Sequence, residues 1–249
     1  MGFAGKSVWI IGASDGIGAA LARALAREGA RLILSARNKS ALEALAVECG
    51  DARVLPLDLA DTGSLDVAVA SIAPGALDAV ICTAALYDPG RVENMSREAT
   101  ARLVAVNLLG SFDVTRLTPP LLRDGGQLVL FGSVAGYFGL PGGQPYSATK
   151  AAVNNLAETL RAELAPRVDV RLVCPGFVAT RLTDKNDFSM PALITPDQAA
   201  EAVLKGLKGS SFELHFPKRF TLAVKLLRAL PYAISLRLTS RLGVRQADR

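Results

Sequence analysis

The chain has 249 residues, of which 50% are hydrophobic and 20% charged, and its formal net charge is +5. This composition is typical of a folded globular protein with a large core and excludes a disordered chain. No run of about 20 uncharged apolar residues predicts a transmembrane span, and the first residues lack the layout of a signal peptide. We therefore expect a cytoplasmic protein.

Few residues are suited to hold a metal ion. Cys49, Cys82 and Cys174 lie far apart without a C-x-x-C pair, and His215 is the only histidine. Metal sites are built from clusters of such ligands. We therefore expect no metal, and the cysteine usage predicts a reducing compartment.

The positive charge is concentrated at the C-terminal end. Residues 205–249 contain ten Lys or Arg and two acidic residues, a net charge of +8, whereas residues 1–204 contain eighteen basic and twenty-one acidic residues, a net charge of −3. A nucleic-acid-binding core would itself be basic, so we expect no nucleic-acid partner.

Short apolar runs alternate with amphipathic stretches along the chain. Runs without polar alternation are typical of parallel strands that are buried on both faces. The pattern predicts an α/β fold, a Rossmann-type doubly wound and mostly parallel seven-stranded sheet with helices on both faces. The strands are expected at 7–11, 31–35, 53–57, 78–82, 127–131, 168–173 and near 212–216, and the main helices at 17–29, 39–49, 62–73, 96–122 and 146–165.

A glycine-rich turn follows the first predicted strand and opens the first predicted helix. It reads Gly12-Ala13-Ser14-Asp15-Gly16-Ile17-Gly18. Glycines permit a tight turn and let backbone N–H groups approach a pyrophosphate at the helix N-terminus. The turn therefore predicts a dinucleotide site.

The end of the second strand bears on which dinucleotide is bound. An NAD site usually carries a carboxylate about 20 residues beyond the glycines, but here the sequence reads Ser35-Ala36-Arg37-Asn38. The planar guanidinium of Arg37 suits a 2′-phosphate, although a solvated arginine is the alternative, and Asp15 is an unfavourable neighbour for a phosphate. We expect NADP(H) in preference to NAD(H).

Tyr146 and Lys150 are four residues apart in a predicted helix, so their side chains share one face. A phenol with a pKa of about 10 is a poor proton donor or acceptor at neutral pH. A nearby lysine favours the phenolate and is expected to lower that pKa. On its own this spacing is also typical of a surface pair, but downstream of the glycine-rich turn it predicts a proton-transfer site.

Together these residues resemble the classical short-chain dehydrogenase/reductase family over roughly residues 5 to 205. The glycine turn matches the family's Gly-x-x-x-Gly-x-Gly, and Ser133 lies thirteen residues before Tyr146, the family's usual interval. Further matches are Asn107 of the middle helix, Asp58-Leu59 beside the adenine, and the stretch from Pro175 to Thr180 beside the nicotinamide.

The resemblance has two departures. Ile11 stands where the family commonly has threonine, and Cys82-Thr83-Ala84-Ala85 replaces its Asn-Asn-Ala-Gly. The second segment steadies the sheet and backs the cofactor in the family. The change therefore bears on local stability and cofactor geometry more than on the chemistry.

The resemblance implies an oxidoreductase that moves a hydride between nicotinamide and a carbonyl or alcohol. It implies that Tyr146 is the general acid or base, that Lys150 lowers its pKa and bonds the nicotinamide ribose, that Ser133 polarises the substrate carbonyl, and that Asn107 positions a water. The implied cofactor-binding residues are Gly12, Ser14, Asp15, Gly16, Ile17, Gly18, Arg37, Asn38, Asp58, Leu59, Ala84, Tyr146, Lys150, Pro175, Gly176, Val178 and Thr180.

The predicted pocket walls are mostly apolar, so we expect an uncharged ketone, aldehyde or lipid-like substrate. They comprise Tyr137, Phe138 and Leu140 with the stretches 83–87 and 177–193, and Arg181 is the only candidate there for an arginine clamp. A nucleotide-binding sensor or scaffold of the same fold is one alternative. A 3-ketoacyl (fatty acyl) reductase is another alternative, and the basic tail could supply the basic patch near the pocket that such an enzyme needs.

Relatives in this family commonly form dimers or tetramers through helices 96–121 and 146–165, so we expect a homodimer or homotetramer.

Residues 1–217 are predicted to form the single domain, and residues 218–249 a basic, amphipathic helical extension. Two basic and apolar segments, 219–230 and 232–242, flank Pro231. Such segments are typical of helices that lie in a membrane interface. The alternative is that they cover the substrate entrance or form a dimer contact, so a peripheral membrane contact remains one of two hypotheses.

Overall fold

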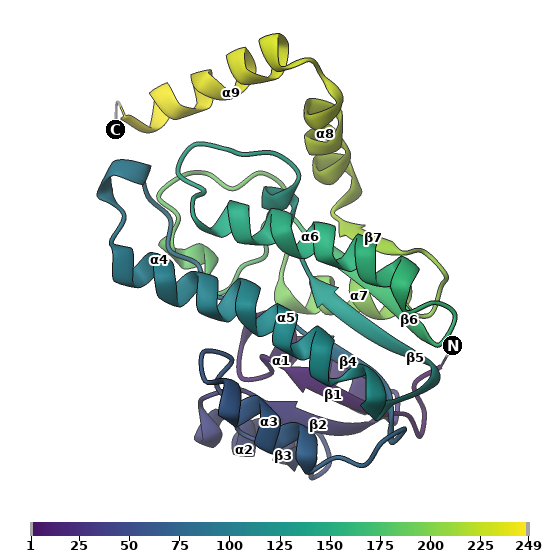
Figure 1. Cartoon of the computed structure of the whole chain (residues 1–249). Coiled ribbons are helices and arrows are strands. Elements are labelled where there is room, and N and C mark those ends of the chain that lie inside the picture. Colours follow the sequence, from purple (N-terminus) through teal and green to yellow (C-terminus); the bar gives the residue numbers. More distant parts are fainter. Residues whose placement is uncertain (1, 248–249) are drawn as a thin grey trace.

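A computed structural model describes residues 2–247, with side chains to residue 240, so that residues 248–249 of the predicted extension lie outside the described range. Its centre is a seven-stranded parallel sheet in the order β3-β2-β1-β4-β5-β6-β7 (Figure 1). The strands are β1 (Ser7–Ile11), β2 (Arg31–Ser35), β3 (Arg53–Val54), β4 (Leu77–Cys82), β5 (Leu122–Phe131), β6 (Val168–Pro175) and β7 (Glu213–Phe216). The predicted doubly wound fold is confirmed.

Helices cover both faces of the sheet. Successive residues of a strand point to opposite faces, so Ile10 packs among side chains of α1, α2 and α7, whereas Trp9 and Ile11 pack among those of α3, α5 and α6. Burial on both sides explains why the strands lack polar alternation. The helices are α1 (Gly16–Arg27), α2 (Lys39–Glu48), α3 (Thr62–Ala70), α4 (Arg97–Val104), α5 (Gly110–Leu117), α6 (Tyr146–Glu163), α7 (Pro196–Leu207), α8 (Lys218–Ala229) and α9 (Tyr232–Ala247).

The structure differs from the sequence prediction in two of the helices. The stretch predicted as one helix over 96–122 is divided into α4 and α5 by a π-helical turn, Ala105–Leu109, which contains Asn107. Single π turns inside helices are frequent at functional sites. The predicted helices do not include α7, although Thr195 and Gln198 form a capping box at its start, and this pattern is readable in the sequence.

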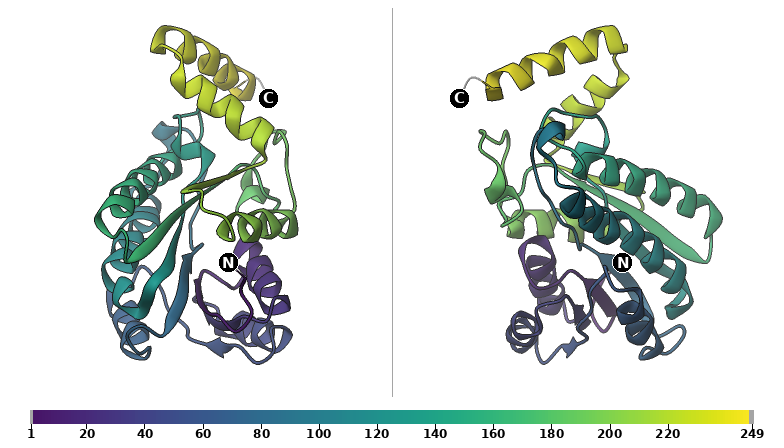
Figure 2. Two further views of the ribbon diagram at one scale, coloured as in Figure 1. Left: turned by 90° about the vertical axis from the view of Figure 1, so that its right-hand side faces the viewer. Right: turned by 60° about the vertical axis from the view of Figure 1, so that its left-hand side comes forward.

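The strand order reverses between β1 and β4, and in such sheets ligands bind at the carboxyl ends of the strands near this point. Helix α8 begins at Lys218, two residues after β7 ends, and α9 follows it (Figure 1). The two helices project beyond the carboxyl edge of the sheet, as the other views also show (Figure 2). They therefore lie on the side of the molecule where a ligand is expected.

Candidate active site

The glycine turn after β1 fits a dinucleotide pyrophosphate. Gly12 has a φ of 97°, and a Cβ there would lie 2.5 Å from the backbone nitrogen of Ala84; a Cβ on Gly18 would lie 2.1 Å from the carbonyl oxygen of Gly12. Asp15 precedes α1 without capping it through its side chain. The first amides of α1 are thus left as donors, the arrangement that binds phosphate at a helix N-terminus.

Thr83 holds this turn where the family pattern departs. Its hydroxyl lies 3.1 Å from the carbonyl oxygen of Ile11 and 3.0 Å from that of Gly12, and the backbone N–H groups of Thr83 and Ala84 donate to Ile11 as well. A single hydroxyl therefore ties the end of β4 to the glycine turn. Although the sequence here differs from the family's Asn-Asn-Ala-Gly, the end of β4 is still hydrogen-bonded to the glycine turn.

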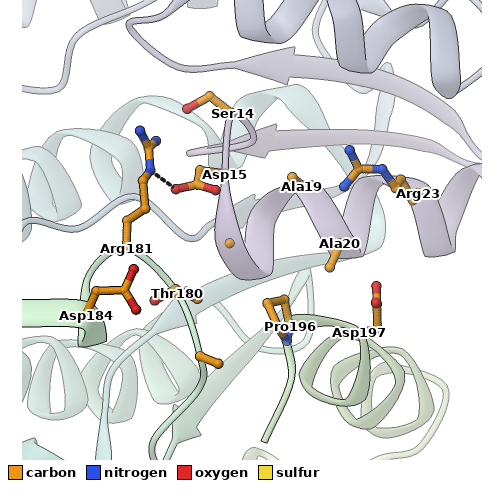
Figure 3. A pocket seen from close by; sticks show the side chains of 12 residues that line it. Ser14, Asp15, Ala19, Ala20, Arg23, Thr180, Arg181, Asp184, Pro196 and Asp197 are labelled. Atoms are coloured by element: carbon orange, nitrogen blue, oxygen red, sulfur yellow. Dashed lines mark hydrogen bonds and ion pairs between the residues drawn. The ribbon is translucent and has the colours of Figure 1, made fainter.

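Asp15 forms an ion pair with Arg181, which comes from the segment after β6 (Figure 3). The pair lines a pocket of about 460 Å³ between the glycine turn, α1 and residues 179–184, and none of the four predicted catalytic residues lines it. Arg181 is thus paired with Asp15 and is not a free clamp for a charged substrate. The positive charge of Arg181 also offsets the negative charge of the Asp15 carboxylate, which on its own would be unfavourable beside a phosphate.

Arg37 and Asn38 lie two and three residues after the end of β2 and have different surroundings. Arg37 is exposed to solvent. The Asn38 side chain caps α2, with its Oδ1 accepting a hydrogen bond from the backbone N–H of Ala41 at 3.1 Å. The guanidinium of Arg37 is thus the polar group available at this strand end.

The remaining predicted cofactor residues lie at the end of β6 or on the loops after β3, β4 and β6, hence along the same edge of the sheet. Asp58 is held by its own loop, since its Oδ1 accepts from the N–H of Ala60 at 3.0 Å. These residues are Asp58, Leu59, Ala84, Pro175, Gly176, Val178 and Thr180. The sheet therefore gathers them beside the glycine turn.

Tyr146 and Lys150 lie one turn apart at the start of α6, as their spacing predicts. The Lys150 ammonium is 5.7 Å from the centre of the Tyr146 ring and donates a hydrogen bond of 2.6 Å to the carbonyl oxygen of Phe131, the last residue of β5. Lys150 is buried, with 3% of its surface exposed. The lysine therefore anchors the start of α6 to β5.

Ser133 stands two residues after β5 and faces the same phenol. Its Oγ accepts a hydrogen bond from the N–H of Ala135 at 3.1 Å, which fixes the oxygen. The proximity of the Ser133 side chain favours the phenolate of Tyr146 and so acts to lower the pKa of that phenol. The two hydroxyl groups thus converge on one point.

Burial is the largest cause of the shifted pKa values of Tyr146 and Lys150. It raises the pKa of Tyr146 to about 12, against the opposing effect of the Ser133 side chain, and it lowers the pKa of Lys150 to about 8. The prediction that Lys150 leaves the pKa of Tyr146 below its usual value is wrong for this structure, because loss of solvation outweighs the favourable contacts. At neutral pH the phenol is therefore protonated.

Asn107 links α6 to the loop after β4. Its Nδ2 donates to the carbonyl oxygen of Leu86 at 2.8 Å and to Oγ1 of Thr149 at 3.3 Å, and its Oδ1 accepts from the N–H of Leu86 at 2.7 Å. Both amide protons are thus used by the protein, which leaves one lone pair of Oδ1 for a water. The π-helical turn directs this side chain inward.

Tyr87 covers the phenol of Tyr146, a contact that the sequence did not predict. Its ring packs against that of Tyr146 in a T-shaped arrangement, and its hydroxyl bonds Oδ1 of Asn186 at 2.7 Å. Lys185 donates to the backbone carbonyl of Tyr87 at 2.7 Å. These two hydrogen bonds therefore hold the segment after β6 against Tyr87 and thus close to Tyr146.

Across the described residues, no cluster of His, Cys, Asp and Glu side chains could hold a metal ion.

Comparison with known proteins agrees with this geometry. A sequence profile described as short chain dehydrogenase matches residues 6–189. Ketoacyl reductase HetN of Nostoc sp. is 34% identical over 223 residues, covering 84% of this chain and 78% of that protein. A short chain dehydrogenase from Burkholderia cenocepacia, solved with NADP, is 29% identical with a TM-score of 0.84, covering 96% of this chain and 99% of its own. One from Burkholderia phymatum, solved with NAD, has a TM-score of 0.82 and covers 92% and 95%, but at 21% identity it shows the fold alone.

Proposed function

The chain belongs to the short-chain dehydrogenase/reductase family and is an NAD(P)-dependent oxidoreductase, and on that premise we propose that it reduces an uncharged, apolar ketone or aldehyde with NADPH. The observation that carries the proposal is the convergence of Ser133 and Tyr146 on one point, with Lys150 buried behind them. We assign catalysis to these three residues and Asn107.

The protein's own part in the reduction is to hold the carbonyl oxygen and to give it a proton. The cofactor supplies the hydride that the carbonyl carbon receives. Ser133 donates a hydrogen bond to the carbonyl oxygen, and Tyr146, whose pKa is about 12, stays protonated at neutral pH and transfers its phenolic proton to that oxygen. Lys150, whose ammonium lies 5.7 Å from the centre of the Tyr146 ring, stabilises by its charge the phenolate left behind, and a proton returns to that phenolate through water.

We favour NADP(H) over NAD(H) because of Arg37. No carboxylate stands at the end of β2 to bond a ribose 2′-hydroxyl, and the exposed guanidinium of Arg37 offers a charged fork for a 2′-phosphate. The NADP-bound neighbour from Burkholderia cenocepacia supports this preference. The other predicted cofactor residues keep the roles that the family resemblance implies.

Reduction of a 3-ketoacyl group is a second candidate function. It is favoured by the identity to a protein named a ketoacyl reductase and by the basic α8 and α9 at the carboxyl edge of the sheet. An acidic acyl carrier would bind such a surface. A sensor or scaffold is disfavoured because Ser133, Tyr146 and Lys150 are all in place.

We also propose a homodimer or homotetramer. Leu109 and Phe112 are 55% and 48% exposed at the junction of the π-helical turn and α5. Large exposed side chains that adjoin one another are typical of subunit contacts. Size-exclusion chromatography with light scattering of Leu109→Ser/Phe112→Ser tests this surface, and an unchanged mass would contradict it.

The proposed activity is tested by NADPH consumption with long-chain and cyclic ketones and aldehydes and with a 3-ketoacyl thioester, for the wild type and Tyr146→Phe. We expect turnover by the wild type and a loss of at least about a hundredfold in the variant, with NADPH binding retained. Equal inertness of both proteins despite NADPH binding would favour the sensor. Exclusive use of the thioester would favour the ketoacyl reductase.

A further inference from the structure

Helices α8 and α9 form a uniformly basic segment. The sequence has no Asp or Glu between Glu213 and Asp248. Lys225 pairs with Glu213, whereas Arg219 and Arg237 are exposed. The five cations of residues 218–240 are Lys218, Arg219, Lys225, Arg228 and Arg237.

The same two helices expose aliphatic side chains. Of the twelve large hydrophobic residues that are exposed among the described side chains, six lie on α8 or α9. Leu222 and Leu226 are one turn apart on α8, so they share a face, and are 55% and 65% exposed. The four on α9 are Tyr232 (62%), Ile234 (49%), Leu236 (54%) and Leu238 (46%).

A matching partner must bury aliphatic groups and present negative charge. The same surface of a second copy presents positive charge and would be repelled. The surface of an anionic bilayer meets both needs, because its headgroups attract Lys and Arg and its outer acyl region takes up Leu and Ile. Within residues 2–247, the structure has no helix with the length and hydropathy needed to cross a bilayer.

α8 also contacts both walls of the proposed substrate site. The ring of Phe220 lies 5.5 Å from that of Phe177, in the segment after β6. Lys225 pairs with Glu213, and Glu213 accepts a hydrogen bond from Tyr137, four residues beyond Ser133. The basic and apolar helices therefore adjoin the catalytic end of the sheet (Figures 1 and 2).

We propose that α8 and α9 bind the surface of an anionic lipid bilayer and so place the substrate entrance at that surface. The proposed binding to the bilayer is supported by the charge and the exposed apolar side chains of the two helices, independently of the proposed function. The delivery of a lipophilic substrate rests on the proposed function. The two parts are separable, because binding to lipid is measured without turnover.

The charge is tested by co-sedimentation of the full chain with vesicles. We expect the wild type to sediment with an equal mixture of phosphatidylcholine and phosphatidylglycerol and to remain free with phosphatidylcholine alone. Arg219→Gln/Arg237→Gln is expected to weaken binding at least about tenfold. The matched control, Arg27→Gln/Arg31→Gln, removes two exposed arginines from α1 and β2 and is expected to bind as the wild type does. Equal loss in both variants would overturn the proposed surface.

The apolar part is tested with Leu226→Ser/Leu236→Ser against Val47→Ser/Val67→Ser, whose valines are exposed on α2 and α3. We expect only the first variant to lose vesicle binding, with both keeping the wild-type mass in solution. Failure of the wild type to bind anionic vesicles would overturn the proposal, and so would dissociation of an oligomer by the leucine variant alone. NADPH consumption with a soluble ketone, measured in parallel, reports separately on the proposed function.

Discussion

The rings of Tyr87 and Tyr146 pack in a T-shaped arrangement, with the centroids 4.9 Å apart and the planes inclined by 75°. Tyr87 is itself held by the hydrogen bond to Asn186. Burial is the main cause of the raised pKa of Tyr146, and the proximity of Tyr87 adds to it. The contact between these two rings thus links the pKa of the Tyr146 phenol to the position of the segment after β6.

Replacing Tyr87 by alanine is therefore expected to change a pH profile. Water reaches Tyr146 in this variant, so its pKa falls from about 12 by about one unit. Oxidation of an alcohol needs the phenolate, and the rise of kcat/KM with pH is expected to move down by the same amount. Tyr87→Phe keeps the ring that shields the phenol and loses the hydroxyl, which is a smaller cause of the raised pKa than burial, so its profile should move much less than that of Tyr87→Ala. An unshifted profile for Tyr87→Ala would show that the ring does not shield the phenol.

The lowered pKa of Lys150 predicts how the free energy of unfolding depends on pH. Its pKa is about 8 in the folded protein, against 10.5 for a solvated lysine side chain, so between these values the unfolded chain binds more protons than the native one. The free energy of unfolding gains a contribution from Lys150 that rises with pH over this window and is absent below it. A shift of this size corresponds to about 3 kcal/mol.

The measurement is urea unfolding of the wild type and Lys150→Met between pH 7 and pH 10.5. We expect the stability difference between the two proteins to change by about 2–3 kcal/mol in favour of the wild type as the pH rises, with turnover lost in the variant. Lys205→Met, at an exposed position of α7, should show no such change. Parallel curves for all three proteins would mean that Lys150 is not held in a desolvated site.

Arg37 is expected to decide cofactor choice. A charge-assisted hydrogen bond contributes about 1.5–3 kcal/mol, so Arg37→Ala should weaken NADPH binding about tenfold to a hundredfold and leave NADH binding within about twofold. Fluorescence titration measures both constants. Lys39→Ala removes a cation two residues away that pairs with Glu43 at 3.5 Å and serves as control. Equal weakening for both cofactors would remove Arg37 from the 2′-phosphate site.

The ion pair of Asp15 and Arg181 is expected to affect binding more than stability. Both side chains are largely exposed, at 43% and 75%, and such pairs contribute about 0–1 kcal/mol. Arg181→Gln leaves the carboxylate uncompensated beside the proposed pyrophosphate, so the Kd for NADPH should rise several-fold while the melting temperature stays nearly constant. Asp15→Asn/Arg181→Gln should restore the affinity. A double variant as weak as the single one would show that Arg181 contacts the cofactor itself.

The parts of this protein that the sequence predicted are those with a local pattern. Tyr146 and Lys150 are one turn apart because a helix has 3.6 residues per turn, and the apolar strands are recognisable because burial on both faces removes polar alternation. The glycine turn is local too. The capping box of Thr195 and Gln198 at the start of α7 is an equally local pattern.

Contacts between distant segments were not predictable in this way. Asn186 lies 99 residues from Tyr87, and Arg181 lies 166 residues from Asp15, and no spacing rule joins them. The pKa of Tyr146 was predicted in the wrong direction because the charge of Lys150 is visible in the sequence, whereas the burial that opposes it arises from packing.

The absence of a side chain at Gly132 lets α6 approach the end of β5, next to Ser133. A Cβ on Gly132 would lie 1.9 Å from Oδ1 of Asn154, a buried residue of α6. Gly132→Ala is expected to lower the free energy of unfolding by about 1–3 kcal/mol and to reduce kcat, since the strain moves Ser133 relative to Tyr146. Asn154→Ala in the same chain removes the clashing amide and should recover part of both losses. Gly90→Ala, where a Cβ meets nothing within 4 Å, should unfold as the wild type does. If Gly132→Ala matched that control, the close approach would not constrain the site.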